Sequence, residues 1–309
     1  MNIRNITITL LTGIMVFSVS SCLKDESEAQ KAEEMRILEN YILTNNILVT
    51  PTESGLYYIE SLAGTGDSAK VGSWMEIQFT GRLLSNNQVV MTSDMQVAKD
   101  HNIHNPAIYY GPTRLVLGQI SYEGLNQGIA MMKEGGKARL IFPSDLGLGG
   151  QSSVVIPAYS SMIFDIELLE VIPDISSYER ELMLAYLEAN DISTDSTGSG
   201  IYFKETVVGT GDQPDDGDLV TLTYTGKLMN GIEFDNSGKS FSFHIGRHEV
   251  IPGFEEAVKL MRKDGSATVV IPYYYAYGEY GRLDSYYRSV IPPFTTLVFD
   301  LHITSITKF

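Results

Sequence analysis

The residues of this chain that could do chemistry are aromatic side chains in its C-terminal third, with one carboxylate, Asp235, among them. That part of the chain has no Ser/His/Asp grouping, no Gly-rich phosphate loop and no cysteine. A single aromatic residue is most simply a core residue, but several from separate predicted elements indicate an apolar concavity beside Asp235. These aromatic residues are Tyr224, Phe234, Phe241, Phe243, Phe254, Tyr277 and Phe299.

Such a pocket suits one reaction especially well, the rotation about an X–Pro peptide bond. This rotation needs no nucleophile and no proton transfer, only the loss of amide resonance, and its barrier is about 20 kcal/mol. A dry site destabilises the polar planar imide relative to its less polar twisted form. A few hydrogen-bond donors can then hold the carbonyl groups in the twisted geometry.

The chain contains two copies of one domain. GLYYIESLAGTGD from Gly55 and GIYFKETVVGTGD from Gly200 are 145 residues apart. EGLNQGIAMMKEGGKARLIFP ends at Pro143 and PGFEEAVKLMRKDGSATVVIP ends at Pro272, an offset of 129. So long a period, with length changes confined to Gly-rich and polar stretches, indicates a tandem duplication rather than a solenoid.

Within each copy most segments alternate between apolar and polar residues, as in VTLTYTGKL and KARLIFP, and are predicted strands. One segment per copy instead has apolar residues at i, i+3, i+4 and i+7, which predicts an amphipathic helix. Because so short a helix is not stable alone, its apolar residues must pack against the sheet. The predicted fold class is therefore α+β, with an antiparallel sheet curled over one short helix in each domain. The stripes are Phe254, Ala257, Val258 and Met261 in the second copy and Leu125, Gly128, Ile129 and Met132 in the first.

A further short amphipathic helix is predicted before each domain. Residues 33–47 carry Met35, Leu38 and Ile42 at near-helical spacing. We expect these helices to dock on their own chain; dimerisation through the 33–47 helix is the alternative. The predicted organisation is thus helix plus domain twice, over 33–172 and 173–309. In the second helix the predicted features are a capping box of Ser176 and Glu179 and an apolar stripe of Leu182, Ala185, Tyr186 and Ala189.

The second copy resembles the FKBP family, the macrolide-binding peptidyl-prolyl isomerases. The resemblance rests on VTLTYTGKLMNGIEFD, FSFHIGRHEVIPGFEEAV, VVIPYYYAYG and VIPPFTTLVFDLHI, which follow one another in the family's order and cover residues 200–307. A looser match covers residues 55–172. The resemblance implies two domains of the family's fold, one complete and one degenerate.

The resemblance also implies roles for individual residues. Ile251 would offer its backbone N–H to a substrate carbonyl, and Tyr277 would donate its hydroxyl to the amide oxygen. Phe234 and Asp235 would place one aromatic face and one carboxylate beside the imide. Phe254 stands where the family usually has tryptophan as the pocket floor, so we expect a modified substrate preference. The pocket wall would consist of Tyr224, Phe241, Val250, Ile251 and Phe299.

Two parts of the chain depart from the family's pattern. The loop 279–290, which carries three tyrosines, is longer than the compact family loop and could cover the pocket rim or simply pack on itself. The first copy has Phe79 in place of Tyr224 and Leu148 in place of Tyr277. We therefore predict a folded first domain with little or no isomerase activity. At the Phe-Asp pair it offers only Val90 and Met91, with Asp94 out of register, and Ser121 to Leu125 replaces Val-Ile-Pro-Gly-Phe.

The N-terminus is typical of a lipoprotein. An apolar run ends in Val-Ser-Ser before Cys22, the only cysteine of the chain, and this resembles a bacterial lipobox. We expect residues 1–21 to be a signal peptide, Cys22 to be lipidated and residues 22–32 to form a flexible tether; an incidental cysteine is the alternative. The protein would then be anchored on the extracytoplasmic side of a bacterial cell-envelope membrane.

The predicted function is peptidyl-prolyl cis-trans isomerisation that assists the folding of extracytoplasmic proteins. Its partners would be proline-containing polypeptides, and the resemblance implies macrolides as further ligands. We predict no cofactor and no metal, because His101 and His104 in the first copy lie in a loop without a third ligand. The net charge of −16 argues against nucleic acid as a ligand. The alternative function is a non-catalytic chaperone or surface binding module.

Overall fold

The computed structural model describes residues 14–193, 196–284 and 288–309. Most of the predicted signal peptide, together with Tyr286 and Tyr287 of the predicted long loop, lies outside these residues. Within the described ranges, none of the helices combines the length and the apolar character that crossing a membrane would need.

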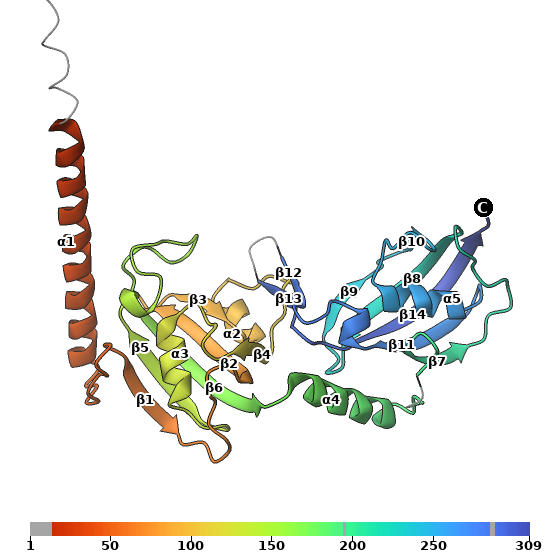
Figure 1. Cartoon of the computed structure of the whole chain (residues 1–309), viewed down its shortest axis with the longest axis horizontal. Coiled ribbons are helices and arrows are strands. Elements are labelled where there is room, and N and C mark those ends of the chain that lie inside the picture. The colour runs from red at the N-terminus through yellow and green to blue at the C-terminus, as the bar shows by residue number, and fades with distance from the viewer. Residues whose placement is uncertain (1–13, 194–195, 285–287) are drawn as a thin grey trace, which may run out of the picture. The chain divides into compact units, whose positions relative to one another are not determined.

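The chain folds as two compact units (Figure 1). Unit 1 consists of Met1–His104 and Gly111–Val171, and unit 2 consists of Asn105–Tyr110 and Ile172–Phe309. Each unit is built on a six-stranded antiparallel sheet with helices packed against it. The predicted α+β class is therefore confirmed.

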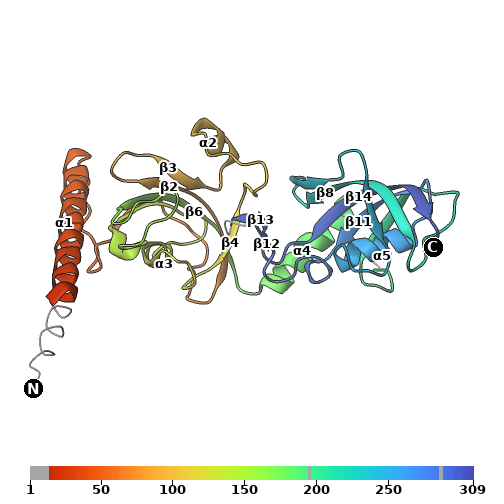
Figure 2. The same ribbon diagram turned by 90° about the horizontal axis from the view of Figure 1, so that it is seen from above.

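The sheet of unit 1 joins strands that are mostly distant in the chain. One helix, α3 (Glu123–Ala130), lies along the side of this sheet that we call the inner face (Figure 2). The predicted stripe of this helix is buried there against Leu140 and Phe142. A short helix, α2 (Met95–Asp100), and a 3₁₀ turn, η1 (Ser144–Leu146), lie in the connections. In spatial order the strands are β1 (Tyr57–Leu62), β5 (Lys137–Phe142), β6 (Met162–Ile172), β2 (Trp74–Leu83) and β3 (Val89–Thr92), with β4 (Thr113–Val116) on the other half of β2.

Unit 2 repeats this arrangement. Its inner-face helix is α5 (Pro252–Leu260), whose predicted stripe is buried, and a 3₁₀ turn, η2 (Tyr273–Tyr275), matches η1. The long loop that follows η2 adds a hairpin of β12 (Arg282–Leu283) and β13 (Ser289–Ile291). The main sheet runs β10 (Phe241–His244), β8 (Leu219–Leu228), β14 (Leu297–Thr307), β11 (Ser266–Ile271) and β7 (Tyr202–Val207), with β9 (Glu233–Asn236) on the other half of β8.

A second helix packs on the opposite, outer face of each sheet. In unit 1 the C-terminal part of α1 (Ile14–Thr44) buries Leu38 against Ile141 and Ile163. These strand residues alternate with the inner-face residues, so they point to the other side of the sheet. In unit 2, α4 (Ile175–Ala189) packs in the same way against Val270 and Val298. The expected docking of each helix on its own chain is therefore confirmed.

Two expectations about the second helix were wrong. Asp174, rather than Ser176, is the N-cap, because its carboxylate accepts from the backbone N–H of Ser176 at 3.0 Å. Glu179 does not cap the helix; it is 1% exposed and accepts from the N–H of Thr296 at 2.6 Å. The buried stripe is shifted by one residue from the predicted one, since Leu182 is exposed. It consists of Ile175, Glu179, Met183 and Leu187.

The first helix carries the same buried acid. Glu34, 145 residues before Glu179, is 4% exposed and accepts from the N–H and the hydroxyl of Ser144 and from the hydroxyl of Ser161. A charged group is buried only where hydrogen bonds compensate its desolvation. Each helix therefore fixes its position on its own sheet through one glutamate.

The helix α1 is longer than predicted. It begins at Ile14 rather than near residue 33, so the segment 22–32, expected as a flexible tether, is helical. Residues 23–32 contain no glycine or proline and are rich in Glu, Lys, Ala and Gln, all strong helix formers. The predicted lipidation residue, Cys22, falls within the backbone range of this helix.

Candidate functional site

The inner face of unit 2 brings the predicted aromatic residues together. The ring of Tyr224 lies 5.7 Å from that of Phe241, 5.4 Å from Phe254 and 6.0 Å from Phe299, all edge-on. Phe234 lies 5.7 Å from Phe299, and Phe299 lies 5.1 Å from Phe254. These separations are those of interacting aromatic pairs. We call these five residues the aromatic cluster.

The aromatic cluster has a buried floor and a more open wall. Phe254 on α5 and Phe299 on β14 are 3% and 5% exposed, whereas Tyr224, Phe234 and Phe241 are half-buried. The floor is thus dry, and the wall can receive a ligand. Phe254, which the resemblance predicts to be the pocket floor, is among the buried residues of the cluster.

One glycine allows this packing. Gly226 on β8 lies opposite Asp235 on β9, and a Cβ at that position would come within 2.8 Å of both the Phe234 and the Phe299 rings. Any larger residue would push the two rings away from the strand. Gly81 in unit 1 holds the equivalent position under Phe164.

The cluster contains a hydrogen bond that the sequence did not predict. The Tyr224 hydroxyl donates to a carboxylate oxygen of Asp235 at 3.0 Å. Burial, with a further contribution from Asp235, raises the pKa of Tyr224 to about 12, so the hydroxyl stays protonated at neutral pH. The two residues are diagonal neighbours on paired strands, a relation that the strand pairing alone could have indicated.

The remaining predicted site residues lie against the core that contains the floor of the cluster. Val250, Ile251 and Tyr277 are half-buried and pack against the core of unit 2. Ile251 precedes α5 as its N-cap residue. Among the hydrogen bonds of the described residues, its backbone N–H has no intramolecular acceptor, so this group is available to a ligand carbonyl. The structure thus brings all nine predicted site residues of unit 2 to one region.

At the equivalent positions, unit 1 lacks the polar side chains of this site. Its strand register places Met91 opposite Gly81, where unit 2 has Asp235 opposite Gly226. Asp94 instead caps α2 by accepting from the N–H of Val97, so the prediction that it is out of register is confirmed. Phe164 keeps the place of Phe299. The other replacements that the structure aligns are Phe79 for Tyr224, Thr113 for Phe241, Tyr122 for Ile251 and Leu148 for Tyr277.

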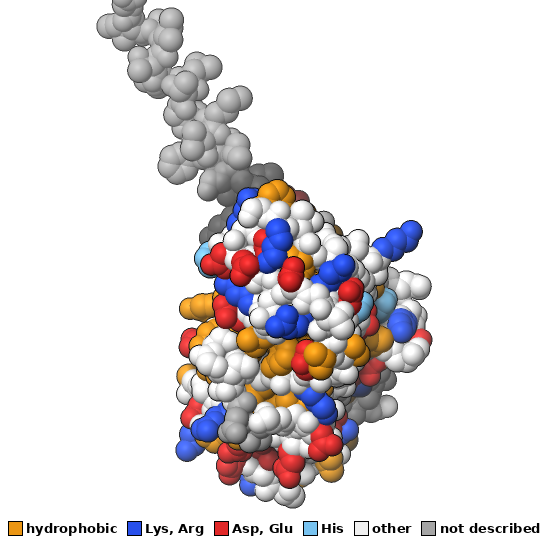
Figure 3. All heavy atoms as spheres, turned by 90° about the vertical axis from the view of Figure 1, so that its right-hand side faces the viewer, with side chains coloured by type: hydrophobic (Ala, Val, Ile, Leu, Met, Phe, Trp, Pro, Cys, Tyr) orange, Lys and Arg blue, Asp and Glu red, His pale blue; other side chains and the backbone are white. Residues whose placement is uncertain are grey.

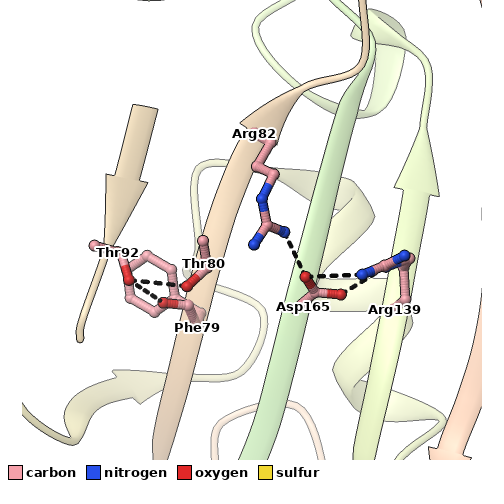
Figure 4. Close-up of polar contacts among 6 residues, drawn as sticks. All are labelled: Phe79, Thr80, Arg82, Thr92, Arg139 and Asp165. Carbon is pink, nitrogen blue, oxygen red and sulfur yellow. Dashed lines mark hydrogen bonds and ion pairs between the residues drawn. The ribbon is translucent and has the colours of Figure 1, made fainter. Parts of the chain in front are cut away.

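The outer faces carry paired charges. In unit 1, Asp165 on β6 pairs with Arg139 on β5 at 2.6 Å and also with Arg82 on β2 (Figure 4). In unit 2, Asp300 on β14 pairs with Lys227 on β8 at 2.9 Å. Depressions of about 580 Å³ and about 600 Å³ lie on these faces. Because these depressions are lined mainly by polar and charged strand residues rather than by aromatic rings, we place the candidate site on the inner face of unit 2.

The surface carries charges of both signs. On the face that Figure 3 shows, acidic and basic side chains are interspersed, and hydrophobic side chains form a band across the middle.

Comparison with known proteins gives matches over both units. The family model described as "FKBP-type peptidyl-prolyl cis-trans isomerase" matches residues 66–169 and 211–304. The chain is 40% identical over 114 residues to the probable isomerase FkpA of Neisseria meningitidis serogroup B, covering 36% of this chain and 39% of that protein. It is 35% identical over 130 residues to FkpA of Escherichia coli K12, covering 41% and 44%.

The name of a third relative refers to the bacterial outer membrane. The chain is 38% identical over 116 residues to the outer membrane protein MIP of Legionella longbeachae, covering 36% of this chain and 46% of that protein. In each of these three matches the chain spans less than half of the relative's length.

Proposed function

Because the chain belongs to the FKBP-type peptidyl-prolyl cis-trans isomerase family, we propose that it catalyses the isomerisation of X–Pro bonds in extracytoplasmic proteins. We place the activity in unit 2. The observation that carries this assignment is the aromatic cluster around the hydrogen-bonded pair of Tyr224 and Asp235. Unit 1, which has Phe79 and Met91 there, is proposed to be inactive.

The proposed mechanism is stabilisation of the twisted imide. The proline ring enters between the half-buried rings and rests on Phe254 and Phe299, where water is excluded. The free N–H of Ile251 donates to a substrate carbonyl, and the Tyr277 hydroxyl donates to the amide oxygen. These contacts favour the twisted form over the planar one, which lowers the barrier without any covalent step.

A protease-coupled assay with an X–Pro peptide tests the proposal. The full chain is expected to accelerate isomerisation, and Tyr277→Phe should lower kcat/KM by about 5- to 10-fold, the contribution of roughly one hydrogen bond. Tyr280→Phe makes the same chemical change on a side chain that is 86% exposed and should have no effect. A macrolide that binds the cluster should inhibit competitively. The absence of any acceleration by the full chain would overturn the proposal.

One observation favours a second candidate function, the binding of unfolded clients without catalysis. Two apolar residues of the loop after η2, Tyr280 and Leu283, are 86% and 51% exposed. If these side chains adjoin in the full loop, they offer an apolar surface of the kind that binds other proteins. Suppression of client aggregation by a full chain that does not accelerate isomerisation would favour this function.

We also propose that Cys22 carries the lipid that attaches the protein to a cell-envelope membrane. The lipobox-like sequence and the relative named outer membrane protein MIP support this location. In bacterial cells fed an alkyne fatty acid, the full chain should incorporate the label and sediment with membranes. Cys22→Ser should lose the label and become soluble, whereas Ser20→Ala should retain it. Labelling that persists in Cys22→Ser would contradict the assignment.

A further inference from the structure

The hairpin of β12 and β13 holds one cation at the edge of the aromatic cluster. Arg282 pairs across the hairpin with Ile291, which is buried in the core of unit 2. The base of the hairpin is tight: Gly281 has a φ of +66°, and a Cβ there would come within 2.2 Å of the Ile291 carbonyl oxygen. Glycine is therefore required at this position, and the backbone beside Arg282 is fixed to the core.

The guanidinium of Arg282 lies over the ring of Tyr277, 5.9 Å from its centroid. This distance is within the range of a cation–π contact. The nearest acid in the hairpin, Asp284, is already held by Arg288 at 2.6 Å. Among the described residues, no carboxylate forms an ion pair with Arg282, whose side chain is exposed. Its charge is therefore available to a ligand.

The charge of Arg282 also reaches into the cluster. It lowers the pKa of the Tyr224 hydroxyl and so opposes the larger effects of burial and Asp235. Asp235 is itself engaged by the Tyr224 hydroxyl. The rim of the cluster thus presents an unpaired cation, while its carboxylate already has a donor.

We propose that Arg282 is a specificity residue that favours substrates with an acidic side chain immediately before the proline. This inference rests on the proposed isomerase function of unit 2. Tyr277 is assigned to the amide oxygen of the X–Pro bond, so a cation over its ring lies on the side of residue X. A guanidinium can bind a carboxylate at that position through two parallel hydrogen bonds.

The test compares two peptides that differ only in charge, Ala-Glu-Pro-Phe and Ala-Gln-Pro-Phe anilides, in the protease-coupled assay with the full chain. The ratio of kcat/KM for the Glu-Pro peptide to that for the Gln-Pro peptide is expected to fall by about 3- to 5-fold in Arg282→Gln. In the wild-type protein the preference should weaken as salt is raised, because the cation is exposed. Arg282→Lys should retain part of the preference through its charge.

The control is Arg180→Gln, which removes the same charge from the exposed side of α4 on the outer face of the sheet. It should leave the ratio unchanged. An equal fall for both peptides in Arg282→Gln would mean that Arg282 only supports Tyr277, and an unchanged ratio would mean that it does not contact residue X; either result overturns the inference. If the wild-type chain accelerates neither peptide, the proposed function itself fails.

Discussion

Asp235→Ala is expected to lower kcat/KM for X–Pro isomerisation by about 10- to 100-fold, since a hydrogen bond to a charged group contributes about 1.5–3 kcal/mol. Asp235 accepts from the Tyr224 hydroxyl at 3.0 Å. Without it, that half-buried hydroxyl loses its partner and the imide loses its only neighbouring carboxylate in the cluster. The measurement is the protease-coupled assay with the full chain. Asp212→Ala, on an exposed aspartate of the same unit, is the control and should change nothing.

A double-mutant cycle tests whether Tyr224 and Asp235 act on the substrate together or independently. If Tyr224 acts through its hydrogen bond to Asp235, Tyr224→Phe and Asp235→Ala should be strongly non-additive, so that the double variant is little worse than Asp235→Ala alone. Fully additive losses would show that the two residues contact the substrate independently. Unchanged activity in Asp235→Ala would remove the site from this cluster altogether.

Glu179→Ala is expected to lower the free energy of unfolding of unit 2 by about 2–3 kcal/mol, because it leaves the buried N–H of Thr296 without an acceptor and opens a gap under α4. Glu181→Ala, two residues along on the exposed side of the same helix, should have almost no effect. Chemical denaturation followed by circular dichroism measures both.

The single tryptophan makes a matched experiment possible. Trp74 lies on β2, so its fluorescence reports only on unit 1. Glu34→Ala should move the unfolding transition of unit 1, followed by fluorescence, to lower denaturant concentration. Glu179→Ala should leave this transition unchanged and should lower the denaturant concentration only of the unfolding transition of unit 2, followed by circular dichroism. Equal shifts of the fluorescence transition in both variants would contradict the independent docking of each helix.

Periodicity in the sequence predicts the inner-face helices correctly, because apolar residues at fixed spacing have only one way to be buried. The aromatic cluster is predicted by the number of aromatic residues in separate elements and by the resemblance to the FKBP family. Phe254 is the clearest case: it begins the helix stripe and is also buried at the base of the cluster. The sequence comparison also predicts that Val90 and Met91 replace Phe234 and Asp235. The strand register agrees, because Met91 lies opposite Gly81 as Asp235 lies opposite Gly226. The helix stripe and the strand positions depend on the spacing of residues along the chain, which can be read directly from a sequence.

Tertiary contacts of polar residues could not be predicted in this way. An acid three residues after a serine fits the local pattern of a helix cap, and this pattern predicts the wrong role for Glu179. Its side chain instead accepts a hydrogen bond from Thr296, 117 residues along the chain. The contact of Arg282 with Tyr277 depends on the hairpin of β12 and β13. This hairpin has no counterpart among the described strands of unit 1, so comparing the two copies does not reveal it. A lone charge in a loop gives no signal of the ring that it will cover.

The buried glutamates have a consequence for how such a chain can evolve. Since Glu34 accepts hydrogen bonds from Ser144 and Ser161 of unit 1, and Glu179 from Thr296 of unit 2, a duplicated segment that begins with its helix brings along groups that hold this helix in place. Such a duplicate can fold without a new partner surface, so residues of its cleft can change while its interior is kept. In unit 1, Met91 stands where unit 2 has Asp235, whereas Phe164 keeps the place of Phe299.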